Sequence, residues 1–152
     1  MKYLLTTLMI MALVPLKSSA TTRDPITGES KACYTQLDTS KRRLLGIKSL
    51  RIFELGASKY TSAATERPEQ YTHSYEFVLK GNGGKNLLAS PVLMNSIATE
   101  ILRRCQSIGS VAFKMSQTDQ AETFGKKQER SISRFICVSN PREPKWGTQL
   151  CP

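Results

Sequence analysis

The sequence predicts an α+β domain in which an antiparallel sheet of about four to five strands carries one main helix packed on one face. Three observations lead to this prediction. Residues 71–80 alternate between apolar and polar side chains, residues 90–105 carry an apolar stripe at helical spacing, and residues 111–138 contain further short alternating segments. A single helix that covers one face of a sheet is the simplest arrangement that buries both kinds of apolar surface.

The chain before the first predicted strand is the least regular part of the sequence. Residues 21–43 are small, polar and charged, and we expect them to form a mobile or partly ordered lead-in. A short helix over residues 40–46 fits the local pattern, and the dense apolar residues that follow predict a strand at about 48–55. The polar segment 56–70 predicts a long loop. The single folded domain is therefore expected over residues 44–152.

Residues 71–80 are the clearest predicted strand. Aromatic and aliphatic side chains, with one histidine among them, occupy every second position, and polar side chains dominate the positions between them. This alternation is typical of a half-buried strand. The glycine-rich segment 81–84 predicts a hairpin turn, because asparagine and glycine both tolerate positive φ. We expect a short return strand at about 86–89.

The strongest helix signal begins at Ser90. Serine is a favoured N-cap, and Pro91 suits the first helical position because its missing N–H would have no partner there. Apolar residues then recur at helical spacing and form one buried stripe. The stripe consists of Met94, Ile97, Ala98, Ile101, Leu102 and Cys105.

Shorter alternating segments predict the remaining strands. One begins at residues 111–116, bends or bulges over the polar residues 117–122 and closes at 123–125, and the last lies at residues 131–138. Residues 139–152 contain three prolines and show no periodicity, so they predict a proline-rich C-terminal loop.

The first 20 residues have the three parts of a secretory signal peptide. Lys2 gives a positive start, residues 4–16 form an uncharged apolar run, and Ser18 and Ala20 place small residues where a signal peptidase cleaves. The apolar run is short for a membrane span. We therefore expect a signal peptide at residues 1–20, a secreted or periplasmic location, and no transmembrane segment after its removal.

The mature chain is expected to remain strongly basic. Removal of the signal peptide takes away two lysines and lowers the net charge from +10 to +8. A basic exported protein is attracted to an anionic polymer or envelope surface, such as acidic polysaccharide, lipid headgroups or nucleic acid. The positive charges stand in short clusters, and none forms a specific nucleic-acid motif. The residues that we predict as contacts are Arg103, Arg104, Lys126, Lys127 and Trp146.

Four cysteines in an exported domain predict two disulfides, with three possible pairings. The expected pairs are Cys105 with Cys137, because the last strand would return toward the end of the helix, and Cys33 with Cys151, which would tie the terminal loops together. The main alternative pairs Cys137 with Cys151. The cysteine spacings fit neither a C-x-x-C redox motif nor a compact zinc site, so we predict no metal and no cofactor.

The second half of the chain combines several short features. They are Ser90-Pro91, the helix stripe with Ile97, Ile101 and Cys105, Thr118-Asp119, Phe124-Gly125, Cys137, and Trp146-Gly147 followed by Cys151. In this combination the segment resembles a group of small exported cyanobacterial-type proteins of uncharacterised function. The resemblance implies a compact exported domain with disulfides, and it carries over no catalytic residue.

His73 is the single histidine of the chain and the main candidate for catalysis. The segment 71–77 resembles the aromatic-His-aromatic-Glu strand of microbial guanyl-specific ribonucleases, in which a carboxylate and a histidine act as base and acid. Here His73 and Glu76 are three positions apart on a predicted strand, so their side chains point to opposite faces. The second histidine of those enzymes is also missing.

The leading functional interpretation is therefore an exported basic disulfide-bonded domain with a non-enzymatic binding role at the cell envelope or outside the cell. One alternative is a small secreted hydrolase, such as a nuclease that uses Glu76 and His73. The other is a structural or inhibitory protein that its disulfides hold rigid. We predict no catalytic residue for the leading interpretation.

Overall fold

The computed structural model describes residues 26, 28–60, 67–127, 131–139 and 145–150. The predicted signal peptide at residues 1–20 lies outside this part of the chain. The described helices are α1 (Lys31–Leu45), α2 (Asn82–Leu88) and α3 (Pro91–Arg104). The strands are β1 (Arg51–Lys59), β2 (His73–Lys80), β3 (Ile108–Met115), β4 (Ala121–Lys126), β5 (Ile132–Arg134), β6 (Ile136–Val138) and β7 (Thr148–Leu150).

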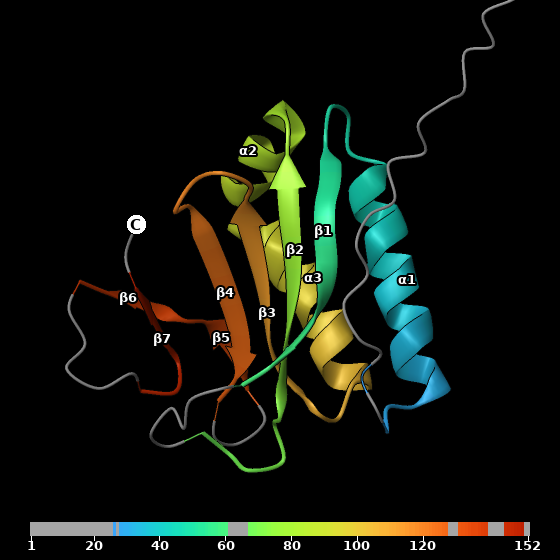
Figure 1. Ribbon diagram of the computed structural model, residues 1–152, viewed down its shortest axis with the longest axis vertical. Helices are drawn as coiled ribbons and strands as arrows, with labels where there is room; N and C mark the ends of the chain where they lie inside the picture. Colours follow the sequence, from blue (N-terminus) through green and yellow to red (C-terminus); the bar gives the residue numbers. More distant parts are fainter. Residues whose placement is uncertain (1–25, 27, 61–66, 128–130, 140–144, 151–152) are drawn as a thin grey trace, which may run out of the picture.

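The α+β class is confirmed, and the helices pack against a five-stranded sheet with the strand order β1-β2-β3-β4-β5. Figure 1 shows α2 and α3 behind this sheet and α1 beside β1, while β6 and β7 form a separate parallel pair near β5. No helix within the described ranges is long and apolar enough to cross a membrane.

The expectation of a purely antiparallel sheet is wrong, because the two central strands are parallel. β2 pairs with β3 in parallel, whereas β1–β2, β3–β4 and β4–β5 are antiparallel. Parallel neighbours need a crossover connection, and here α2 and α3 provide it. The sheet is therefore mixed. The expectation of one main helix is also too simple, since α1 packs beside α3.

The core lies between the sheet and the helices. Tyr75, Phe77 and Leu79 alternate along β2 and point to this side, which confirms the predicted pattern of that strand. The predicted stripe of α3 is buried as well. Ser90 is the N-cap of α3 as predicted, although its side chain makes no capping hydrogen bond.

Helix α1 corrects the interpretation of the N-terminal part. We expected a lead-in over residues 21–43 and at most a short helix over 40–46, but the helix begins at Lys31. Ser30 caps it by accepting a hydrogen bond from the backbone N–H of Cys33 at 3.2 Å. The buried stripe of α1 contains only two leucines, together with Cys33 and Ser40. So thin an apolar stripe gives a weak periodic signal.

Helix α2 replaces the hairpin turn predicted at residues 81–84 and the return strand predicted at 86–89. Gly81 adopts φ 86°, a conformation that favours glycine, and this turn starts the helix. A Cβ on Gly83 would lie 2.5 Å from the carbonyl oxygen of Lys48 and 2.6 Å from the backbone nitrogen of Leu50. The glycines therefore serve close helix packing against the chain before β1.

The predicted strand at residues 131–138 is divided at Phe135 into β5 and β6. The predicted C-terminal loop at residues 139–152 contains β7, which pairs with β6. The last part of the chain is therefore more regular than its three prolines suggest.

The disulfide between described residues joins Cys33 to Cys105, with their Cα atoms 4.7 Å apart. Both expected pairings, Cys105 with Cys137 and Cys33 with Cys151, are wrong. The reason is the position of α1, which runs antiparallel to α3 so that its first turn meets the end of α3 (Figure 1). The alternative pairing of Cys137 with Cys151 is compatible with this bond. Cys151 lies outside the described residues, so a second disulfide stays a prediction.

Candidate binding site at the end of helix α3

A pocket of about 440 Å³ opens where the last turn of α3 meets the end of β4 and the start of β5. We call it the basic pocket. Its lining residues are Tyr71, Leu102, Arg103, Gln106, Lys126 and Ile132. The volume lies within the range of small-molecule sites, which is roughly 300–1,000 Å³. The lining combines two cations with apolar side chains, so the pocket suits a ligand that is both anionic and partly apolar.

Lys126 is the central cation of the basic pocket. It is the last residue of β4, and its Nζ donates a hydrogen bond to the carbonyl oxygen of Cys105 at 2.8 Å. The same Nζ lies 4.7 Å from the centre of the Tyr71 ring, within the range of a cation–π interaction. Burial lowers the pKa of the Lys126 ammonium, and the negative charge of Glu29 offsets part of this shift. The ammonium is therefore partly desolvated and held in one direction.

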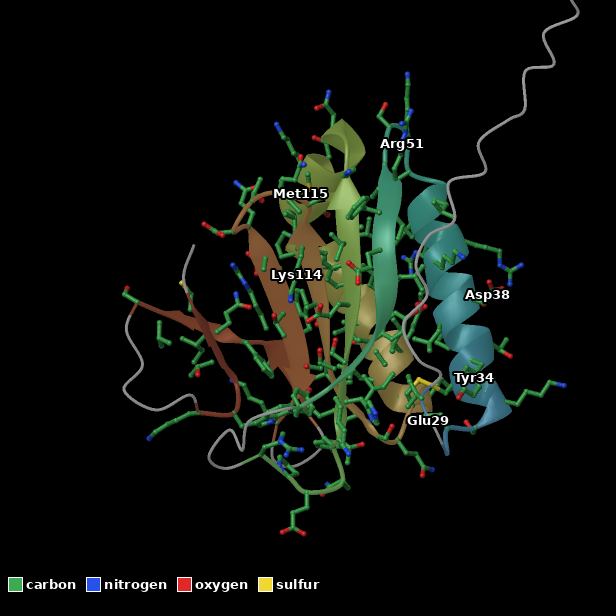
Figure 2. All side chains as sticks on the ribbon, viewed as in Figure 1. Glu29, Tyr34, Asp38, Arg51, Lys114 and Met115 are labelled. Carbon is green, nitrogen blue, oxygen red and sulfur yellow. A yellow bond between two sulfur atoms is a disulfide. The ribbon has the colours of Figure 1, made fainter. Side chains whose placement is uncertain are left out.

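Glu29 fixes the chain that leaves α3. Its carboxylate accepts hydrogen bonds from the backbone N–H of Gln106 at 3.1 Å, the backbone N–H of Ser107 at 2.5 Å and the hydroxyl of Ser107 at 2.6 Å. Burial raises the pKa of this carboxyl, but the hydrogen bonds from Ser107 and Gln106 outweigh it and hold the pKa below its usual value. We call this contact the Glu29 clamp. Figure 2 shows Glu29 beside the disulfide.

An aromatic cluster contacts both the ammonium and the backbone of Lys126. Its members are Tyr60, Tyr71, Phe135 and Trp146. The indole Nε1 of Trp146 donates a hydrogen bond to the carbonyl oxygen of Lys126 at 2.7 Å. The Trp146 ring stacks on that of Tyr71, with centroids 6.3 Å apart. Trp146 therefore fixes the backbone that carries the central cation.

Gly109 allows this aromatic cluster to approach β3. A Cβ at this position would lie 2.6 Å from the Cβ of Tyr71 and 2.9 Å from the ring of Trp146. Any side chain here would therefore displace the two rings that flank Lys126.

The structure brings together three of the five residues predicted as contacts. Arg103 and Lys126 line the basic pocket, and Trp146 binds the backbone of Lys126. Arg104 and Lys127 follow the two lining cations in the chain but are not among the lining residues. Sequence reasoning missed Glu29, Tyr71 and Gln106. No local signal pairs Glu29 with Ser107, because the two residues are separated by 78 positions.

One group of metal-ligating atoms occurs within the described part of the chain. A carboxylate oxygen of Glu29 and the sulfur atoms of Cys33 and Cys105 lie within 4.8 Å of one another. The two sulfur atoms are joined in the disulfide, however, so neither is a thiolate that could bind a metal. The carboxylate already accepts three hydrogen bonds. We therefore assign no metal to this group.

His73 and Glu76, the residues of the hydrolase alternative, have separate partners. The Nδ1 of His73 lies 2.8 Å from the hydroxyl of Thr72, and Glu76 accepts a hydrogen bond from the Nζ of Lys114 at 2.7 Å. Figure 2 shows Lys114 on the sheet face that points away from the helices. The three-residue spacing along β2 places His73 and Glu76 on opposite faces of the sheet.

A second pocket, of about 470 Å³, lies between α2 and β4. Its lining residues are Lys85, Leu88, Ala89, Gln120, Ala121 and Glu122. Glu122 is already paired with Arg134 at 2.5 Å. This pocket therefore combines an exposed lysine with a neutralised carboxylate, and its described lining residues include one cation where those of the basic pocket include two.

No protein-family model, no curated protein and no solved structure matches this chain. The resemblance to small exported cyanobacterial-type proteins therefore stays a prediction.

Proposed function

We propose that this protein is an exported, non-enzymatic binding domain that holds an anionic group in the basic pocket. The observation that carries the proposal is that its two cations lie side by side and form no ion pair with another described residue. Lys126 is half-buried beside Arg103, and neither side chain forms an ion pair with another described residue. A partly desolvated ammonium without a paired anion costs free energy, and an anionic ligand would recover it.

The composition of the basic pocket favours binding over catalysis. Among the residues that the structure describes, its lining contains no carboxylate, histidine or thiol, which are the groups that supply most general acid–base and nucleophilic chemistry. The carboxylate of Glu29 influences the charge of Lys126, but it accepts hydrogen bonds from the backbone N–H groups of Gln106 and Ser107 and is not free to act as a base. The arrangement can bind and orient an anion, and it offers no evident proton relay.

Export is a separate part of the proposal. It rests on the signal-peptide pattern of residues 1–20, and the Cys33–Cys105 disulfide supports it because disulfides persist in oxidising compartments. Intact-mass analysis of secreted or periplasmic material should give a chain that begins at Thr21. Recovery of the full-length protein from the cytoplasm alone would contradict export.

The binding proposal can be tested by nuclear magnetic resonance on the oxidised, isotope-labelled protein. Titration with butyrate or with inorganic phosphate should shift the amide signals of Arg103, Gln106, Lys126 and Ile132, and also the indole N–H signal of Trp146. Replacement of Lys126 by Gln should raise the dissociation constant obtained from these shifts at least about tenfold. The reason is the loss of a charge-assisted hydrogen bond worth roughly 1.5–3 kcal/mol.

The matched control is Lys48→Gln, which removes the same charge from the exposed turn between α1 and β1. This variant should bind both anions like the wild type. Small shifts spread over all basic residues, reproduced by sodium chloride and insensitive to Lys126→Gln, would show a charged surface without a site and would refute the proposal.

A further inference from the structure

We infer that the ligand of the basic pocket is a single aliphatic chain ending in one anionic headgroup, a carboxylate or a phosphate. This inference rests on the proposed function and specifies which anionic molecules the same pocket selects. Three observations carry it: the hydrogen-bond donors at the pocket, the apolar side chains around them, and the contacts that already cover the Tyr71 ring.

The donors fit one small headgroup. An ammonium has three N–H donors, and Lys126 uses one of them on the carbonyl oxygen of Cys105. The guanidinium of Arg103 adds a planar fork of donors that matches two oxygens of a carboxylate or phosphate. Glu29 does not neutralise Lys126 by direct contact, because its carboxylate accepts hydrogen bonds from the chain after α3.

The remaining lining fits an aliphatic chain. Leu102 and Ile132 present branched aliphatic groups, and the methylene stems of Arg103 and Lys126 extend this apolar surface. A chain that lies along these groups would bury its methylenes while its headgroup stays with the two cations.

An aromatic ligand fits less well, because Tyr71 supplies the one aromatic ring among the described lining residues and this ring is already in use. The ring of Tyr71 stacks on Trp146 and carries the Nζ of Lys126 over its face. Nucleobases and sugar rings are usually held by open aromatic faces. The lining residues that the structure describes offer no open aromatic face.

A long anionic polymer is the other occupant to consider. Polymers are bound by rows of cations, and their affinity falls steeply with salt because many counterions are released. Within the described ranges, the lining cations of the basic pocket are Arg103 and Lys126. A single headgroup bound there should show the weak salt dependence of one or two charges.

The test is a chain-length series of carboxylates from butyrate through octanoate to dodecanoate, each kept below its micelle-forming concentration. Binding is followed by the fluorescence of Trp146, the chain's single tryptophan, whose indole contacts the backbone of Lys126. Affinity should rise about threefold to fourfold per added methylene until the pocket is full. Octanol and octyltrimethylammonium, which have the chain without the anion, should bind at least about tenfold more weakly than octanoate.

Two variants separate the headgroup from the chain. Lys126→Met keeps an apolar stem and should weaken every carboxylate by a similar factor while the chain-length trend remains. Ile132→Ala should flatten the trend while butyrate still binds. The matched control Lys48→Met should change neither quantity. Preference for dodecyl phosphate over dodecanoate would assign the ligand to phosphate-bearing lipids, and the reverse preference to free fatty acids; either result supports the inference.

The outcomes also separate the two proposals. Equal affinity for butyrate, octanoate and dodecanoate would overturn the inference and leave the proposed anion-binding function intact. Octanol or octyltrimethylammonium binding as tightly as octanoate would overturn the inference as well. If an anionic polymer binds tightly, with a steep salt dependence, and displaces dodecanoate, the inference is overturned, and the ligand is a polymer and not an aliphatic molecule. Failure of every anion, including phosphate, would refute both.

Discussion

The two ends of the sheet are held together by different kinds of contact. At the lower end in Figure 1, α1, α3 and β4 are joined by a disulfide, by the Glu29 clamp and by the hydrogen bond from Lys126 to Cys105. At the upper end, α2 packs on the chain before β1 through glycines that let the backbones touch. The lower end thus contains partly buried charges, whereas the upper end contains closely packed backbone. Of the two ends, only the lower one is suited to recognise an ion.

The disulfide should make the largest difference between the two ends. The bond closes a separation of 72 residues, and the loop-entropy model assigns about 4 kcal/mol to a loop of that size. The double variant Cys33→Ser/Cys105→Ser should therefore lose about 4 kcal/mol of unfolding free energy. Denaturant unfolding followed by Trp146 fluorescence measures the loss. The double variant also avoids mispairing of a single remaining thiol. A loss below about 1 kcal/mol would show that the clamp holds the lower end without the bond.

At the upper end, Gly83→Ala tests the close packing of α2, because Gly83 has no positive φ that would add backbone strain. The new Cβ would meet backbone atoms of Lys48 and Leu50, which cannot move without shifting the start of β1. Overpacking costs about 1–3 kcal/mol, and the better helix propensity of alanine returns up to about 1, so we expect a net loss of about 1–2 kcal/mol. Gly84→Ala is the matched control, because its Cβ would meet side chains and no backbone atom: the sulfur of Met115 at 2.8 Å and the Cβ of Leu79 at 3.2 Å.

Thermal unfolding of the two alanine variants decides whether the glycines matter for contact or for backbone freedom. Contact predicts that Gly83→Ala is clearly less stable than Gly84→Ala. An equal loss in both variants would mean that the close approach of α2 to the chain before β1 is not the cause. Close packing would then not distinguish the upper end from the lower end.

Elements whose signals are local were predictable from the sequence. β2 was predicted because its alternation repeats over eight residues, and α3 because Ser90-Pro91 precedes a full apolar stripe. α2 was missed because its glycines resemble a turn when the neighbouring backbone is unknown. α1 was missed because Ser40 occupies a buried position that a sequence pattern counts as polar.

The site was only partly predictable, because its contacts join distant parts of the chain. Arg103, Lys126 and Trp146 were selected for charge and for aromatic area, and the fold brings them to one place. Glu29 and Tyr71 were not selected, since their roles depend on α1 lying beside α3 and on the parallel pairing of β2 with β3. Both follow from topology, which no local pattern encodes.

The Glu29 clamp should have a smaller effect than the disulfide. Glu29→Gln replaces an acceptor of three N–H and O–H groups by an amide. We expect a loss of about 1 kcal/mol at neutral pH, because the carboxylate is only partly buried and solvent screens its charge. The pKa of Glu29 is lower in the folded protein, so its contribution is present above the unfolded pKa and is lost as the pH falls through the folded pKa.

The difference in stability between the wild type and Glu29→Gln should therefore shrink below about pH 4.5, the usual value for a glutamate. Urea unfolding at several pH values measures it. The control is Glu69→Gln at an exposed position. A difference that stays constant down to low pH would show that the amide disrupts packing and that the charge of the clamp is irrelevant.

The smallest expected effect concerns the charge of Lys126 at alkaline pH, and it has the opposite sign. Burial lowers the pKa of the folded Lys126, so between this value and the usual value near 10.5 the unfolded chain binds more protons than the folded one. Stability should therefore rise with pH through this window, and only slightly, because the side chain is about half exposed and solvent screens its charge. Lys126→Met should remove the rise, and Lys48→Met should leave it unchanged.

Unfolding free energies at several alkaline pH values, compared between the two variants, give the difference. An identical pH slope in the two variants would mean that the Lys126 ammonium is as well solvated as a surface lysine, and the lower end would then have no special preference for an anion.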